Sequence, residues 1–247
     1  MTRETRFSRR RLLTAGALAA APLASASAGV IRGDMPWQDG AADAPRAPSL
    51  SRDYLFFTAS EAAFIEAATE RLVPTDELGP GAVAAGVPIF IDRQLAGGFG
   101  RGGNWYMQGP WDKGLPTQGY QTRLTPAAMY RAAIRGIDQQ VGRQGRAGTF
   151  AKLSPADQDA FLKSLENGQV ELGGGVDAKA FFDIFLQNTI EGFWSDPIYG
   201  GNRDMVGWKL IGFPGARYDH SPFVAQHGNA YPLPPVSLKG RPAWNRS

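Results

Sequence analysis

Residues 192–218 read GFWSDPIYGGNRDMVGWKLIGFPGARY, the densest run of aromatic, glycine and proline residues in the chain. Its six glycines and two prolines leave no window long enough for a regular helical period, so we expect no helix here. Its six aromatic side chains make it too apolar for a solvated loop. The stretch therefore has to pack against something.

Within this stretch, Asp196-Pro197 is followed by Tyr199-Gly200-Gly201-Asn202, a pattern that predicts two successive turns. Proline fixes φ, whereas Gly and Asn tolerate positive φ. Asp196 is the carboxylate of greatest interest in the chain. Because Asp before Pro commonly accepts backbone amides across a turn, we favour that structural role over a catalytic one.

The two motifs SDPIYGGN (195–202) and GWKLIGFPG (207–215) resemble the signature of the gluconate 2-dehydrogenase subunit 3 family. The resemblance extends more loosely over 55–218, including TASE at 58–61 and TPAAMYR at 125–131. The candidate signature or partner-interface residues are Trp105, Trp111, Trp194, Asp196, Pro197, Tyr199, Gly200, Gly201, Asn202, Trp208, Gly212, Phe213 and Pro214. For the tryptophans, a place in the core and a place in an interface are both open.

Members of that family are small subunits of membrane-associated, FAD-dependent periplasmic sugar and sugar-acid dehydrogenases. They stand beside a large flavoprotein of the GMC type and a multihaem cytochrome c. The resemblance implies a non-catalytic chain without catalytic, cofactor-binding or metal-binding residues of its own. FAD would lie in the catalytic partner and haem c in a third subunit.

The N-terminus has the pattern of a twin-arginine export signal. Arg9 and Arg10 precede an alanine-rich apolar run, and Ala26-Ser27-Ala28 forms a cleavage motif. The run is shorter than the roughly 20 residues of a membrane-spanning helix. We expect residues 1–28 to be recognised by the twin-arginine translocase, and the folded protein to reach the periplasm, peripheral to the inner membrane through its complex.

Charge and cysteine content exclude several classes of function. The first 28 residues contain five Arg and one Glu, so the remaining chain has 21 basic and 22 acidic residues. This near neutrality removes the electrostatic support for nucleic-acid binding. The chain contains no cysteine, which excludes disulfides, thiolate metal sites, iron–sulfur clusters and covalent c-type haem attachment.

The rest of the chain predicts a mostly α fold of about five helices in one irregular domain, with long Gly/Pro/aromatic loops. Helix starts are indicated at Thr58, Thr125, Ser154 and Asp177, and residues 87–95 read as a further short helix or a turn region. The only strand candidate is Val170–Leu172.

These patterns also divide the chain. Residues 29–52 read as a flexible leader, 53–218 as the helical domain, and 219–247 as a proline-rich extended arm. The 97–124 segment is a long loop whose aromatic residues argue against disorder.

Other motifs are weaker candidates for chemistry. Residues 98–103 match G-x-G-x-x-G, but neither a preceding strand nor a following helix is predicted, so we interpret the match as chance. His220 and His227, the only histidines, lie in the tail and lack partners for a metal shell. Carboxylate pairs such as Asp157 with Asp159, or Asp183 with Glu191, have spacings typical of caps and solvated faces.

One alternative function belongs to a different class. The aromatic loop Gly97–Leu124 could serve a stand-alone periplasmic enzyme or carbohydrate-binding protein as a platform on which sugars stack.

Overall fold

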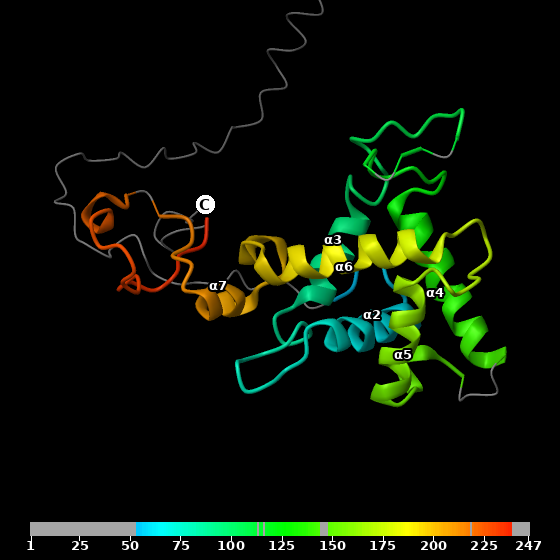
Figure 1. The fold of residues 1–247 in the computed structure, drawn as a ribbon, viewed down its shortest axis with the longest axis horizontal. Coiled ribbons are helices and arrows are strands. Elements are labelled where there is room, and N and C mark those ends of the chain that lie inside the picture. The colour runs from blue at the N-terminus through cyan, green and yellow to red at the C-terminus, as the bar shows by residue number, and fades with distance from the viewer. Residues whose placement is uncertain (1–52, 113, 116, 144–147, 218, 239–247) are drawn as a thin grey trace, which may run out of the picture. The chain divides into compact units, whose positions relative to one another are not determined.

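A computed structural model describes residues 53–112, 114–115, 117–143, 148–217 and 219–238, and these residues form a helical fold (Figure 1). The helices are α2 (Ala59–Leu72), α3 (Val87–Ala96), α4 (Pro126–Arg143), α5 (Pro155–Glu166), α6 (Ala178–Trp194) and α7 (Val206–Ile211). Within these ranges there are no strands, which confirms the prediction of a mostly α fold. The predicted signal and leader, residues 1–52, lie outside the described residues.

Side-chain caps place the helix starts where the sequence predicts them. Thr58 and Glu61 form a capping box on α2: the Glu61 amide donates to Thr58 Oγ1 over 3.4 Å, and the Thr58 amide donates to Glu61 Oε2 over 2.9 Å. At the start of α5 the Ser154 hydroxyl accepts the Asp157 amide, and at the start of α6 the Asp177 carboxylate accepts the Ala180 amide. Such caps satisfy amides that have no partner within the helix.

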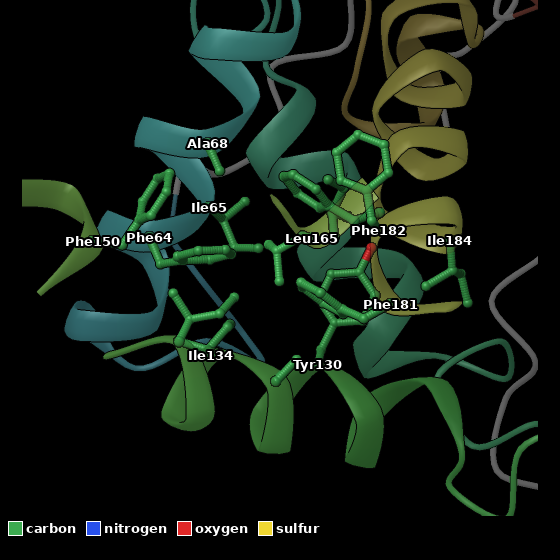
Figure 2. Packing of buried hydrophobic residues seen from close by; sticks show 14 of the residues in the cluster. Phe64, Ile65, Ala68, Tyr130, Ile134, Phe150, Leu165, Phe181, Phe182 and Ile184 are labelled. Atoms are coloured by element: carbon green, nitrogen blue, oxygen red, sulfur yellow. The ribbon is translucent and has the colours of Figure 1, made fainter. Parts of the chain in front are cut away.

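The helix α6 is the centre of the packing, since it contacts α2, α3, α4, α5 and α7. Aromatic rings fill the space between it and its neighbours (Figure 2). Tyr130 of α4 lies edge-on to Phe181 with 5.4 Å between centroids, and Phe64 of α2 lies 6.1 Å from Phe185. Contacts of this kind add to the stabilisation from apolar burial.

Tyr130 is completely buried, and its hydroxyl has a partner in the core. The Asn188 side-chain amide donates to this oxygen over 2.8 Å. Burial raises the pKa of Tyr130 well above its usual value, so the phenol stays neutral at physiological pH. The pair satisfies two polar groups that would otherwise destabilise the core.

A buried carboxylate fixes the beginning of the described chain to α3. Asp92 is fully buried and accepts the backbone amides of Leu55, Phe56 and Phe57 over 2.7–2.9 Å. Arg131 of α4 adds a hydrogen bond to the Phe56 carbonyl and lies 4.3 Å from the centre of its ring. The segment that precedes α2 is thereby held by two other helices.

Two local predictions were wrong. Val170–Leu172 forms no strand. The stretch expected to be free of helix contains the last three residues of α6 and the whole of α7. Glycine at position 207 is compatible with α7 because it lets the helix start approach another backbone, and Gly212 ends α7 in a left-handed conformation at φ 69°.

The extended form predicted for the C-terminal arm also differs from the structure over residues 219–238. This segment contains a 3-10 turn at Ser221–Phe223, and Phe223 contacts Tyr231 with ring centroids 4.7 Å apart. It then returns to the helical part, where Val236 is only 3% exposed. The reason is a set of hydrogen bonds to the backbone of Pro214 and Ala216 and to the side chain of Asp196, which proline spacing alone does not reveal.

We expect Asp92→Ala to lower the free energy of unfolding by about 3 kcal/mol, because three amides lose a charged acceptor. Chemical denaturation measures this change. The matched control is Asp159→Ala, which removes an exposed ion pair with Arg71 and should cost about 1 kcal/mol or less. Equal effects of the two substitutions would contradict the anchoring role of Asp92.

Candidate partner-binding surface

The signature segment, defined as residues 195–215, begins with a turn organised by Asp196. The Asp196 carboxylate accepts the Ile198 amide over 3.0 Å and caps the 3-10 turn Pro197–Tyr199. Gly200 ends that turn at φ 101°, a value that favours glycine. The predicted role of Asp196 as a turn cap is confirmed.

Asn202 joins the two motifs of the signature segment. It is fully buried and has a left-handed backbone at φ 43°, which Asn tolerates better than most residues. Its side-chain amide donates to the Ser195 carbonyl over 2.9 Å, and its side-chain oxygen accepts the Gly207 amide over 2.8 Å. One side chain thus links the DPIYGGN turn to the start of α7.

Glycines at 201 and 207 allow the segment to lie directly against the end of α6. A Cβ atom on Gly201 would stand 2.0 Å from the Gly192 carbonyl oxygen, and one on Gly207 would stand 2.4 Å from that of Phe193. These distances are far below van der Waals contact, so only glycine fits without a backbone shift. Trp208 completes the junction, since its indole N–H donates to the Trp194 carbonyl over 2.8 Å.

The aromatic residues of the signature segment fall into two groups. Trp208 is 6% exposed, and Trp194 is partly buried with its ring edge-on to Phe193 at 5.2 Å. In contrast, Tyr199 and Phe213 are 49% and 45% exposed, although Phe213 rests edge-on against Trp208. The buried Trp208 ring therefore supports the exposed Phe213 ring.

Asp196 has further partners that the sequence did not reveal. The Ser237 hydroxyl donates to Asp196 Oδ1 and the Leu238 amide donates to Oδ2, each over 2.7 Å. Nearby, the Val236 amide donates to the Pro214 carbonyl over 3.2 Å. Ser237 is 4% exposed, so this contact is part of the folded interior. No periodic or motif signal marks Ser237 in the sequence.

The aromatic loop, residues 97–124, forms a second group of exposed rings. Trp105 lies 4.6 Å from Tyr120 and 5.5 Å from Phe99 between ring centroids, yet it is 37% exposed. Tyr106 is 80% exposed, and Trp111 is partly buried. The Tyr120 hydroxyl donates a hydrogen bond to the Leu124 carbonyl. Burial raises the pKa of Tyr120 to about 12.

The carboxylates that the sequence analysis weighed as candidate catalytic groups form hydrogen bonds or ion pairs with neighbouring side chains. Asp157 contacts the Ser154 cap, Asp159 pairs with Arg71, Asp183 pairs with Lys179, and Glu191 accepts from Gln187. The 98–103 fingerprint follows α3 rather than a strand, and turns follow it. In the part of the chain that the structure describes, no three His, Asp or Glu side chains are grouped as metal ligands would be. His220 contacts the ring of Tyr231.

Among the described helices, none has both the length and the apolar character needed to cross a bilayer.

These features define a helical protein in which a glycine-rich junction at the end of α6 holds exposed apolar side chains in place. The family model for gluconate 2-dehydrogenase subunit 3 matches residues 59–215, from the start of α2 to the end of the signature segment. The chain belongs to this family, and so to a family of dehydrogenase subunits. No curated protein and no solved structure matches the chain.

We expect Gly201→Ala to lower the free energy of unfolding by several kcal/mol, on the order of other severe backbone clashes. The added methyl would have to displace the Gly192 carbonyl. Thermal and chemical denaturation measure the effect. Gly98→Ala is the control, because a Cβ there meets nothing within 4 Å. A stable Gly201→Ala protein would mean that the two backbones are further apart than described.

Proposed function

We propose that this protein is the non-catalytic small subunit of a periplasmic FAD-dependent dehydrogenase that oxidises a sugar, polyol or sugar acid. The observation that carries the proposal is the family match over residues 59–215. In this role the chain binds the large GMC-type flavoprotein and stabilises it. Electrons pass from FAD to a multihaem cytochrome c without entering this chain, which holds no cofactor of its own.

Export is the second part of the proposed function. The Arg9-Arg10 motif within residues 1–28 would direct the pair to the twin-arginine translocase, which carries proteins that have already folded. The flavoprotein would acquire FAD in the cytoplasm and cross the membrane bound to this subunit. The complex would then remain in the periplasm at the inner membrane.

The surface proposed to bind the flavoprotein includes the exposed apolar side chains of the signature segment. Tyr199, Ile211 and Phe213 are 45–62% exposed, and Phe213 rests edge-on against the Trp208 ring. Aromatic and aliphatic anchors of this kind contribute much of the affinity of protein interfaces. Pre-organisation by the α6 junction limits the entropy lost on binding.

Deletion of residues 1–28 should strand the flavoprotein in the cytoplasm, because the pair would lose its only proposed export signal. Dehydrogenase activity in periplasmic and cytoplasmic fractions measures this directly. The control replaces Arg3 and Arg6 with Lys and leaves Arg9-Arg10 intact, so periplasmic activity should persist. Unchanged periplasmic activity in the deletion strain would exclude the export role.

The double variant Ile211→Ser, Phe213→Ser should weaken binding to the flavoprotein at least tenfold while the chain stays folded, because both side chains are exposed. Co-purification followed by a titration of the two components gives the affinity, and flavin absorbance identifies the large partner. Leu55→Ser, at a similarly exposed site outside the signature segment, is the control. Equal affinity of both variants would place the interface elsewhere.

The exposed rings of Trp105 and Tyr106 favour a second candidate function, in which the chain binds carbohydrate by itself. Aromatic rings present flat apolar faces to ligands. Calorimetry of the purified chain with a panel of sugars distinguishes the two functions. Sugar binding or turnover by the lone chain would favour the second, and a complex with flavin only in the large partner favours the first.

A further inference from the structure

An apolar groove is lined by the loop that follows α2, by the end of α6 and by α7. It has a volume of about 470 Å³, and all of its lining residues fall within the family-matched range 59–215. Three of its apolar side chains are strongly exposed: Leu78 by 71%, Leu210 by 48% and Ile190 by 46%. Neighbouring apolar side chains that are exposed in this way mark surfaces that another molecule covers.

The loop wall of the groove is tied down by hydrogen bonds. Glu70 accepts the amides of Thr75 and Val83, and Asp76 accepts the Leu78 amide over 2.8 Å. The backbone groups of Asp76 also pair with those of Gly79 in both directions. Leu78 therefore lies on a hydrogen-bonded turn, and this turn presents its side chain at the groove.

The groove has the character of a protein interface rather than of a small-molecule site. Sites for small molecules enclose most of the ligand and aim several polar groups at it. Here three lining side chains are about half exposed or more, so the groove is open to solvent. Among its described lining residues, only Asp76 and Lys209 have charged side chains. An open apolar groove of this kind suits the anchoring side chain of a partner protein.

Charge indicates what a partner segment must carry. The loop wall presents Asp76 and the adjacent Glu77, both exposed, and residues 73–80 contain no basic side chain. The α7 wall presents one cation, the exposed Lys209. A complementary segment therefore has a basic side chain on the loop side of its apolar anchor. Opposite charges across an interface speed association and fix the orientation of the partner.

We propose that this groove receives one large apolar side chain of the flavoprotein, a leucine or a phenylalanine, next to a lysine or arginine that faces Asp76 and Glu77. Leu210 directly precedes Ile211, so the groove continues the surface proposed above to bind the large subunit. The loop that carries Leu78 forms the second half of that interface. The inference rests on the proposed function, because it assigns part of the same contact.

The first test replaces Leu78 of the full chain with a benzophenone-bearing amino acid and irradiates the complex co-purified with the flavoprotein. We expect peptide mass spectrometry to find a crosslink to one segment of the large subunit, in which an apolar residue neighbours a lysine or arginine. Crosslinks only within this chain, or none after complete activation, would overturn the proposal. Crosslinks to a second copy of this chain would overturn it as well.

The second test measures affinity. Leu78→Ser should weaken binding to the flavoprotein at least tenfold, because the partner loses an apolar contact at the groove. Leu55→Ser is the matched control, since Leu55 is 70% exposed and does not line the groove. Thermal unfolding of each variant alone checks that it is folded.

The third test measures the rate of association. Glu77→Lys should slow binding at least threefold at low salt, and the difference should shrink as the salt concentration rises. Glu171→Lys makes the same change of charge at another exposed carboxylate and should bind at the original rate. Equal rates for the two variants would contradict a basic partner segment at the loop wall.

The outcomes separate this inference from the proposed function. A complex that contains flavin in its large subunit, yet binds the Leu78→Ser and Leu55→Ser chains equally well, would overturn the groove contact and leave the proposed function intact. Failure of the unmodified chain to form any complex with the flavoprotein would instead refute the proposed function and this inference together.

Discussion

The end of α6 constrains the rest of the signature segment. Carbonyls at the C-terminus of a helix have no partners within it. Here the Gly192 carbonyl accepts a hydrogen bond from the Ser195 hydroxyl, and the Trp194 carbonyl accepts one from the Trp208 indole N–H. The Gly192 carbonyl also lies close to the backbone of Gly201, and the Phe193 carbonyl lies close to that of Gly207. Because α6 also contacts five other helices, the position of the segment is coupled to the whole core.

This coupling gives the signature a structural explanation. Its glycines provide room for close backbone contact, and Asn202 ties both motifs together through two hydrogen bonds. The exposed side chains of Ile211 and Phe213 belong to this framework, and Phe213 rests against the buried Trp208 ring. An exposed apolar surface of this kind is suited to binding another protein.

Asp196 has two structural roles. It caps the turn that opens the signature segment, and it holds the chain at Ser237 and Leu238. A single carboxylate thereby connects the family-matched region, which ends at residue 215, with the C-terminal part that follows it.

Local signals in the sequence were sufficient to predict α2, α4, α5 and α6 with their caps, a helix or turn region at the position of α3, and the turn at Asp196. Capping boxes, prolines at first turns and apolar stripes act over a few residues, so they can be recognised without the fold. The short helix α7 was missed because the glycines around it are unfavourable for an isolated helix, and only packing against α6 stabilises it.

In the candidate site, too, some features follow from the sequence and others depend on the tertiary structure. The sequence identified the signature residues through a family resemblance, and it alone determined which of these side chains are aromatic, which are polar and where glycine stands. Only the tertiary structure decided that Trp208 is buried while Phe213 is exposed, and that Ser237 reaches Asp196 from 41 residues away. Burial and long-range hydrogen bonds depend on which surfaces meet, and no local pattern carries that information.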